Sequence, residues 1–170
     1  MPPKHVRTVR QLIYWEYAKL MAGSAVGDRK NFRYVTYCYK RLDAGNLTPS
    51  TILRENKLLV LGEKVCAYCE AECPDLQWEH ILPRSLGGPD TIDNMVLACR
   101  GCNTAKGARD LFAWYGKERQ YEIPRLALGK YLKLIFELHE QAGTLDTSDL
   151  NADAQLDVLD LGAVLAPARA

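Results

Sequence analysis

Two C-x-x-C pairs near the middle of the sequence enclose a carboxylate–histidine pair, Glu79 and His80. The paired cysteines are Cys66, Cys69, Cys99 and Cys102. Four thiolates on two such turns can close a tetrahedral structural zinc site, with Zn–S distances of about 2.3 Å. A bound Zn²⁺ would fix both ends of a segment that is too small and too polar to be held by burial alone. The spacing therefore predicts a four-cysteine zinc site around a histidine that is available for chemistry.

Two further cysteines, Cys38 and Cys73, lie outside these pairs. In a chain without an export signal, C-x-x-C pairs are more typical of metal sites than of disulfides. Cys73 follows Cys69 by four residues and is an alternative ligand, whereas Cys38 is expected to be a buried small hydrophobic residue. Residues 1–7 lack the apolar core of a signal peptide, and no apolar run reaches the roughly 20 residues that span a bilayer. We therefore expect a cytoplasmic protein without a membrane partner.

The segment between the cysteine pairs has the pattern of a β-hairpin followed by a helix. Residues 76–82 and 95–98 are predicted strands, and the loop at 83–94 between them contains two glycines and two prolines. Helix-forming residues with core-facing apolar spacing follow Cys102. In such a ββα unit, a side chain of the first strand can lie opposite the start of the helix.

This arrangement is expected to bring Glu79, His80 and Asn103 close to one small volume. A carboxylate and an amide oxygen are hard ligands that suit Mg²⁺ or Mn²⁺. A neutral imidazole beside such an ion can take a proton from water near neutral pH, while the ion polarises a scissile phosphate and stabilises the leaving oxygen. Lys106 and Arg84 are candidates for contacts with phosphates, and a surface role is the alternative for both.

The segment resembles the HNH endonuclease family, specifically its zinc-stapled, McrA-like branch. The resemblance lies within residues 63–116, about a third of the chain. It is carried by Cys-Ala-Tyr-Cys at 66–69, Glu-His-Ile-Leu-Pro at 79–83, Ser-Leu-Gly-Gly at 85–88, Asp-Asn-Met-Val-Leu at 93–97 and Cys-Arg-Gly-Cys-Asn-Thr-Ala-Lys-Gly at 99–107. Several independent spacings agree, so the resemblance implies an α+β fold with a ββα-metal (HNH) module flanked by N- and C-terminal helices.

The resemblance also implies roles for individual residues. His80 matches the general base, Asn94 matches the asparagine that braces the loop and orients the histidine, and Asn103 matches a ligand of the catalytic ion. Glu79 stands where the family often has aspartate, so as a second ligand its extra methylene group would shift the ion or change the preferred ion. The implied activity is metal-dependent hydrolysis of DNA with Mg²⁺, Mn²⁺ or Ni²⁺, leaving 5′-phosphate and 3′-hydroxyl ends.

The basic residues are concentrated before the first cysteine pair. Residues 1–65 contain twelve lysines and arginines against five acidic residues, although the whole chain has a net charge of only +1. A basic half ahead of a metal-knuckle module indicates a polyanionic partner, which we take to be double-stranded DNA. Arg33, Lys40 and Arg41 lie among aromatic residues and are candidates for contacts with phosphates. An amphipathic helix with a solvated basic face is the alternative.

Helices are expected before the module. The first covers residues 8–22 and ends at Gly23, and the second ends before Gly45. A third is predicted to begin at Thr48-Pro49, because a hydroxyl side chain followed by proline is a typical helix start. Residues 58–61 suit the continuation of this helix or a short strand.

A C-terminal helix is expected between Pro124 and Gly143, with His139 near its end in a surface or capping position. Residues 144–170 contain five aspartates, one arginine and no aromatic residue. This composition predicts a partly disordered tail with a short helix around residues 154–161. We hypothesise that the tail shields the basic surface before DNA binds.

These expectations divide the chain into a basic helical region at 1–62, an HNH nuclease module at 63–120, a packing helix at 121–143 and an acidic tail at 144–170. The predicted function is that of a DNA endonuclease in which His80 activates water and a divalent ion stabilises the leaving 3′ oxygen. The alternative is a non-catalytic zinc module that binds nucleic acid, which would show salt-sensitive binding without cleavage.

Overall fold

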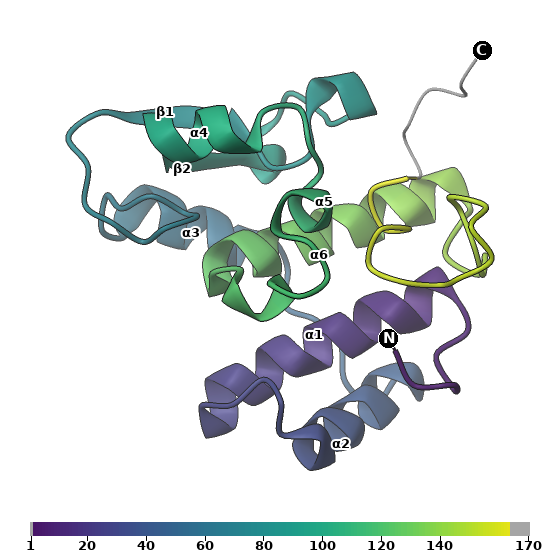
Figure 1. Cartoon of the computed structure of the whole chain (residues 1–170). Helices are drawn as coiled ribbons and strands as arrows, with labels where there is room; N and C mark the ends of the chain where they lie inside the picture. Colours follow the sequence, from purple (N-terminus) through teal and green to yellow (C-terminus); the bar gives the residue numbers. More distant parts are fainter. Residues whose placement is uncertain (1, 164–170) are drawn as a thin grey trace. The chain divides into compact units, whose positions relative to one another are not determined.

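The computed structural model describes residues 2–163. Figure 1 shows its elements in chain order. They are α1 (Val9–Val26), α2 (Phe32–Asp43), α3 (Leu53–Leu61), β1 (Leu76–His80), η1 (Arg84–Leu86), η2 (Ile92–Asn94), β2 (Met95–Cys99), α4 (Arg100–Lys106), α5 (Leu111–Tyr115), η3 (Gln120–Glu122) and α6 (Arg125–Ala142). Helices combined with a small two-stranded antiparallel sheet confirm the predicted α+β class. No helix among the described residues has the length and apolar character needed to cross a membrane.

The described residues form two compact units. The first contains residues 2–50 and 135–163, and the second contains residues 51–134. The boundary between them falls within α6, which contributes its first ten residues to the second unit and the rest to the first. The division into four segments drawn from the sequence stays a prediction.

In the first unit, α1 and α2 pack against each other. Trp15 of α1 and Tyr39 of α2 are both buried, and their rings meet edge to face with centroids 5.6 Å apart. Cys38 is buried beside them on α2, as predicted for an isolated cysteine. The second helix ends before Gly45, also as predicted.

The first helix is longer than predicted because Gly23 does not end it. The helix continues to Val26, and Gly27 follows with a φ of 73°, a left-handed conformation that costs glycine little. A Cβ at Gly23 would lie 2.8 Å from Cγ of Arg29. The missing side chain therefore leaves space for the Arg29 stem, and the glycine serves packing rather than termination.

His139 lies in the C-terminal part of the first unit and is fully buried, so the predicted surface position is wrong. Its Nδ1 atom is 2.9 Å from Thr144 Oγ1, and its Nε2 atom is 3.0 Å from the carbonyl oxygen of Leu161. Because a carbonyl oxygen only accepts, Nε2 carries the proton. Burial lowers the pKa of His139 below its usual value. The histidine therefore joins α6 to the turns that follow it.

Residues 144–163 form a series of turns instead of the disordered segment and short helix predicted from their composition. Buried apolar side chains anchor them, namely Leu145, Val158 and Leu161. The carboxylate of Asp160 is fully buried and accepts hydrogen bonds from three backbone N–H groups of the segment. The acidic side chains thus satisfy backbone donors, which composition does not reveal. The rest of the predicted tail, residues 164–170, lies outside the described residues.

In the second unit, β1 and β2 form an antiparallel hairpin against which α4 packs. The register pairs His80 with Met95. The predicted hairpin is confirmed, except that the first strand ends at His80 rather than at Leu82. The side chain of Asn94 makes both hydrogen bonds to the Leu82 backbone, in place of a strand partner. The chain after β1 is therefore held by the Asn94 side chain instead of by backbone hydrogen bonds to a neighbouring strand.

The third helix begins at Leu53, later than the predicted start at Thr48-Pro49, and residues 58–61 are helical. Lys133 of α6 makes two contacts at this start, both within the second unit. Its ammonium group donates to the carbonyl oxygen of Thr51 at 3.3 Å and pairs with Glu55 Oε2 at 2.5 Å. The observed start thus coincides with tertiary contacts and not with the local start signal.

A second lysine of α6, Lys130, joins α3 to the loop of the hairpin. Its ammonium group donates to the side-chain oxygen of Asn56 and to the carbonyl oxygen of Ile92, the latter at 2.6 Å. Asn56 in turn donates to Asp93 Oδ1 at 2.7 Å. Burial lowers the pKa of Lys130 to about 8. These contacts fix the position of the loop that leads into Asn94 and β2.

Candidate functional site

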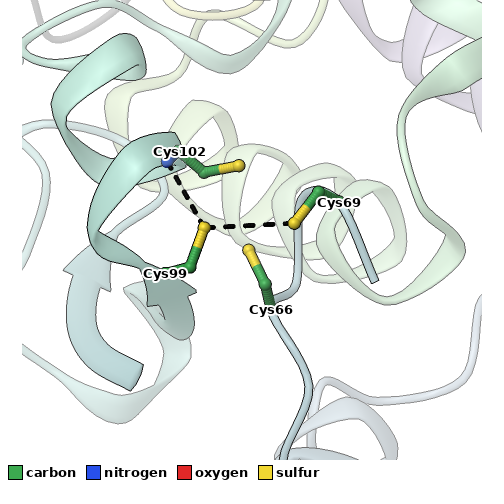
Figure 2. A group of neighbouring side chains, drawn as sticks. All are labelled: Cys66, Cys69, Cys99 and Cys102. Atoms are coloured by element: carbon green, nitrogen blue, oxygen red, sulfur yellow. Dashed lines mark hydrogen bonds between the residues drawn. The ribbon is translucent and has the colours of Figure 1, made fainter. Parts of the chain in front are cut away.

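The four cysteines of the two C-x-x-C pairs lie together, and their sulfur atoms are all within 4.8 Å of one another (Figure 2). Cys69 Sγ and Cys99 Sγ are 3.9 Å apart. A tetrahedral site with Zn–S bonds of about 2.3 Å separates its sulfurs by about 3.8 Å. The donor set and its spacing therefore fit Zn²⁺. The predicted four-cysteine cluster is confirmed and supports a structural zinc-type site.

Cys73, the alternative ligand, lies outside this cluster. Within the cluster, the second cysteine turn is formed by the start of α4. The backbone N–H of Cys102 donates to Cys99 Sγ at 3.5 Å, and this contact is the main reason that the pKa of Cys99 is lowered to about 7 (Figure 2). Because the thiolate is the form that binds a metal, the helix start favours the binding form of Cys99.

One backbone hydrogen bond closes the first cysteine turn, and another attaches it to the hairpin. Cys66 N donates to Ala71 O at 2.9 Å, and Ala67 N donates to Leu97 O of β2 at 2.8 Å. Glu70, with a φ of 58°, allows the chain to turn sharply between these contacts. The turn is thus positioned by the sheet as well as by the cysteine cluster.

Glu79, the predicted ligand of the catalytic ion, is buried and already paired. Its Oε1 atom lies 2.7 Å from Lys106 Nζ, and its Oε2 atom accepts a hydrogen bond from the hydroxyl group of Tyr68. Burial and the nearby Glu79 charge raise the pKa of Tyr68 well above its usual value, so the phenol remains a donor. Both carboxylate oxygens therefore have partners within the second unit.

Lys106 was a candidate for a contact with phosphate or for a surface role, and the structure corrects both expectations. The side chain is fully buried between α4 and β1, where it also donates to the carbonyl oxygen of His80 at 2.9 Å. Burial lowers the pKa of Lys106, and the charge of Glu79 opposes this effect. Its ammonium group thus connects α4 to the end of β1.

His80 leaves β1 on the side opposite to Glu79, because successive side chains of a strand alternate. Its Nε2 atom lies 2.9 Å from Asp90 Oδ1, and 23% of its side chain is exposed. Hydrogen bonding to His80 is the main cause that lowers the pKa of Asp90, and Arg84, 3.9 Å away, contributes. An ionised Asp90 accepts a hydrogen bond from the protonated Nε2 atom. In this tautomer of the neutral imidazole, Nδ1 carries a lone pair instead of a proton.

Asn94 is fully buried and braces the loop that carries Asp90. Its Oδ1 atom accepts a hydrogen bond from Leu82 N at 2.9 Å, and its Nδ2 atom donates to Leu82 O at 2.8 Å and to Pro89 O at 2.9 Å. The backbone oxygen of Asn94 also accepts from Ile81 N at 2.9 Å. One side chain thereby holds the two ends of the loop together, next to His80.

Asn103 lies one turn into α4, because the helix begins at Arg100 and not after Cys102 as predicted. Its Nδ2 atom donates to Gln77 Oε1 at 3.2 Å. Gln77 and Glu79 are two residues apart and therefore lie on the same side of β1, toward α4. Among the contacts of the described residues, none joins the side chain of His80 to that of Asn103 or Glu79.

The basic candidates in the first unit, Arg33, Lys40 and Arg41, are all exposed on α2. The guanidinium group of Arg41 lies 5.7 Å from the ring centroid of Tyr37 and donates to its hydroxyl group at 3.2 Å. Tyr37 is 55% exposed. This helix therefore presents a cation and an aromatic ring together on an accessible surface.

Residues 66–109 match the family model of the HNH endonuclease. The matched range, called the HNH-family segment below, contains both cysteine pairs, the hairpin and α4. No curated protein and no solved structure gives a significant match to the chain.

Two residues with close contacts at the site, Asp90 and Tyr68, were not singled out from the sequence. Asp90 lies in a loop without periodicity, and its contact with His80 depends on the path between η1 and η2. Tyr68 lies inside the first C-x-x-C turn, and the cysteine spacing says nothing about the contacts of the residues between the cysteines. For Lys106 the sequence did hold a signal that its side chain faces the hairpin. Residues three apart on a helix share a face, and Lys106 follows Asn103 at that interval.

Proposed function

We propose that the protein is a metal-dependent endonuclease that hydrolyses phosphodiester bonds in double-stranded DNA. The observation that carries this proposal is the partly exposed imidazole of His80, held by Asp90 within an HNH-family segment. With the Nε2 proton directed to Asp90, Nδ1 is the atom that takes a proton from the attacking water. General base catalysis of this kind contributes about 10²–10⁴-fold to a rate.

A divalent ion completes the proposed chemistry by stabilising the leaving 3′ oxygen. The amide oxygen of Asn103 is available for it, since the contact of this side chain with Gln77 uses the amide nitrogen. Glu79 becomes a ligand only when Lys106 or Tyr68 releases one of its oxygens. Hard oxygen ligands favour Mg²⁺ or Mn²⁺, with Ni²⁺ as a further candidate.

Zn²⁺ at the four cysteines has the structural role in this proposal. Four thiolates leave no open position for a substrate on a tetrahedral ion, which separates the zinc from the reaction. Loss of zinc would free the first cysteine turn, and with it Tyr68, the donor to Glu79. Activity is therefore expected to depend on zinc indirectly.

Contacts with DNA are assigned to basic residues in each unit. Arg84 is 70% exposed and lies 3.9 Å from Asp90, which supports our assignment of its guanidinium group to a phosphate near His80. Arg33, Lys40 and Arg41 are the proposed phosphate contacts of the first unit. Each phosphate contact releases counterions, so DNA affinity should fall steeply as the salt concentration rises.

Cleavage of supercoiled plasmid by the zinc-loaded full chain tests the proposal. We expect nicked or linear product with Mg²⁺, Mn²⁺ or Ni²⁺, and a loss of about 10²–10⁴-fold in the His80→Gln variant, which lacks a titrating base. Lys117→Ala, a change at an exposed residue outside the matched range 66–109, is the control. Equal cleavage by the wild type and His80→Gln would refute the assigned base. Mapping of the cut ends should give 5′-phosphates and 3′-hydroxyls.

One observation favours a second candidate, a non-catalytic zinc module that binds nucleic acid. The Glu79 carboxylate is enclosed by Lys106 and Tyr68, as expected of a residue that stabilises the fold rather than binds an exchangeable ion. This candidate predicts salt-sensitive binding of DNA without cleavage under any divalent ion. The same plasmid assay, combined with a binding measurement at two salt concentrations, separates the two candidates.

A further inference from the structure

The turns at the C-terminal end of the first unit carry a regular series of oxygen-bearing side chains. Counting from Asp149, they occupy the first, third, fifth, ninth and twelfth positions of residues 149–160. They are Asp149, Asn151, Asp153, Asp157 and Asp160. This is the register of a twelve-residue calcium-binding loop, in which the seventh residue adds a backbone carbonyl oxygen. The segment contains four aspartates and no lysine or arginine.

The backbone turns where that register requires it. The sixth position of such a loop is usually glycine, because the chain bends sharply there. Here it is Ala154, whose φ of 63° lies in the left-handed region. The first-position carboxylate closes the bend, since Asp149 Oδ2 accepts a hydrogen bond from Ala154 N at 2.7 Å. The chain departs from the common pattern in having alanine at position six and aspartate, not glutamate, at position twelve.

The carboxylate of Asp149 has one oxygen without a donor. Asp149 Oδ1 is buried and has no hydrogen-bond partner, although the other oxygen of the same carboxylate is bonded. A buried carboxylate oxygen without a partner is costly, and a cation is the kind of ligand that offsets the cost. No lysine or arginine within the described part of the chain forms a salt bridge with Asp149, Asp153 or Asp160. The negative charge is therefore left for a ligand to balance.

The last position of the loop is buried as well. Asp160 is fully buried; its Oδ1 accepts from Leu150 N and Asn151 N, and its Oδ2 accepts from Asp157 N at 2.8 Å. A carboxylate oxygen has two lone pairs, so Oδ2 keeps one for a further ligand. These hydrogen bonds bring the two ends of the loop together around the carboxylates of Asp149 and Asp160.

We propose that residues 149–160 bind one Ca²⁺ ion through Asp149, Asn151, Asp153, Asp157, Asp160 and the carbonyl oxygen of Gln155. An all-oxygen set with four carboxylates suits Ca²⁺, which accepts six to eight such ligands in flexible geometry, better than Zn²⁺ or other ions that prefer nitrogen and sulfur. In the described residues only the four cysteines bring three or more ligand atoms within metal-binding distance. Binding therefore draws the loop carboxylates inward from a wider arrangement. The proposed ligands include none of the four cysteines and none of the residues of the proposed nuclease centre.

Calorimetric titration of the zinc-loaded full chain with Ca²⁺, in buffer freed of calcium, tests this proposal. We expect one Ca²⁺ per chain, and a rise in the melting temperature when Ca²⁺ is added in excess. Asp149→Asn should weaken Ca²⁺ binding by tenfold or more, while keeping an oxygen for the bond to Ala154. Asp153→Asn, a change at an exposed position that removes no buried packing, should weaken it as well. Asp146→Asn, outside the loop and also exposed, is the control and should bind like the wild type.

The result is independent of the nuclease proposal, because Asn103→Ala should leave Ca²⁺ binding by residues 149–160 intact. Absence of Ca²⁺ uptake by the wild type at millimolar concentration would overturn the proposal. So would uptake that Asp149→Asn and Asp153→Asn both leave unchanged. Equal affinity for Mg²⁺ and Ca²⁺ would overturn the choice of ion. Mg²⁺ requires near-octahedral geometry and gives up its bound water reluctantly, so a site built for Ca²⁺ should bind it more weakly.

Discussion

Lys106 Nζ lies 2.7 Å from Glu79 Oε1, and both side chains are buried. The hydroxyl group of Tyr68 donates to the second oxygen of the same carboxylate. This buried group connects α4, β1 and the first cysteine turn at the centre of the HNH-family segment. Glu79 therefore stabilises the fold through these two contacts, and it could bind an ion only by giving one of them up.

Removal of Lys106 should therefore destabilise the second unit. In Lys106→Met, the Glu79 carboxylate keeps its burial and loses its countercharge, which typically costs about 3–5 kcal/mol. The double variant Glu79→Gln/Lys106→Met should recover part of this loss, because the uncompensated charge is gone. Urea unfolding with zinc present measures both. A Lys106→Met protein as stable as the wild type would mean that the pair contributes nothing to the fold.

Asn103 should affect the requirement for the divalent ion more than the fold. Its amide oxygen is the proposed ligand, while its one described side-chain contact, with Gln77, lies at the exposed edge of the hairpin. Asn103→Ala is expected to raise the Mg²⁺ or Mn²⁺ concentration needed for half-maximal cleavage, and Asn103→His should restore part of the activity by supplying another ligand. Gln77→Ala separates the two roles, since it removes the contact and keeps the ligand. An unchanged metal dependence in Asn103→Ala would exclude it as a ligand.

Asp90 should matter for the rate through His80 and not through binding. The Asp90→Asn side chain keeps its size but no longer holds the Nε2 proton by charge, so the imidazole loses its fixed orientation. By analogy with other carboxylates that orient histidines, we expect cleavage to slow on the order of tenfold to a hundredfold. DNA affinity, measured separately without a divalent ion, should not weaken. A variant with full activity would show that the contact at 2.9 Å is incidental.

The sequence allowed the local part of this architecture to be predicted. The cysteine cluster, the hairpin and the following helix depend on short-range spacing, and all three are present in the structure. The partners of Glu79 were not predictable in the same way. Lys106 is 27 residues away along the chain, and its burial follows from how α4 packs on β1. Composition also misled at residues 144–163, where aspartates bond to the backbone within turns instead of repelling one another in an open tail.

Two glycines of the HNH-family segment should respond to alanine in opposite ways. A Cβ at Gly88 would lie 1.9 Å from the carbonyl oxygen of Leu82 and 2.7 Å from Asn94 Nδ2, so Gly88→Ala must displace the brace and should cost roughly 1–3 kcal/mol. A Cβ at Gly101, inside α4, would meet nothing within 4 Å, so Gly101→Ala should stabilise the helix by about 0.5–1 kcal/mol. Thermal unfolding of both variants provides the comparison. Equal effects would contradict the close approach at Gly88.

His139 should make the stability of the first unit depend on pH. Burial lowers its pKa in the folded chain, whereas the unfolded chain has the ordinary value of about 6.5. Below that pH the unfolded state binds more protons, so stability is full above about 6.5 and falls as the pH decreases toward the folded pKa. The nearby charge of Asp160 opposes the shift without cancelling it.

Comparison with His139→Gln isolates this contribution from all other titrating groups. Glutamine can still donate to the carbonyl oxygen of Leu161 but does not titrate, so its unfolding midpoint should fall less than that of the wild type between pH 7.5 and pH 5.5. Zinc release at low pH affects both proteins alike and cancels in the difference. Parallel curves for the two proteins would mean that His139 becomes protonated without leaving its buried position. A wild-type curve that falls more steeply would show that a proton on Nδ1, the atom that lies 2.9 Å from Thr144 Oγ1, destabilises the folded first unit.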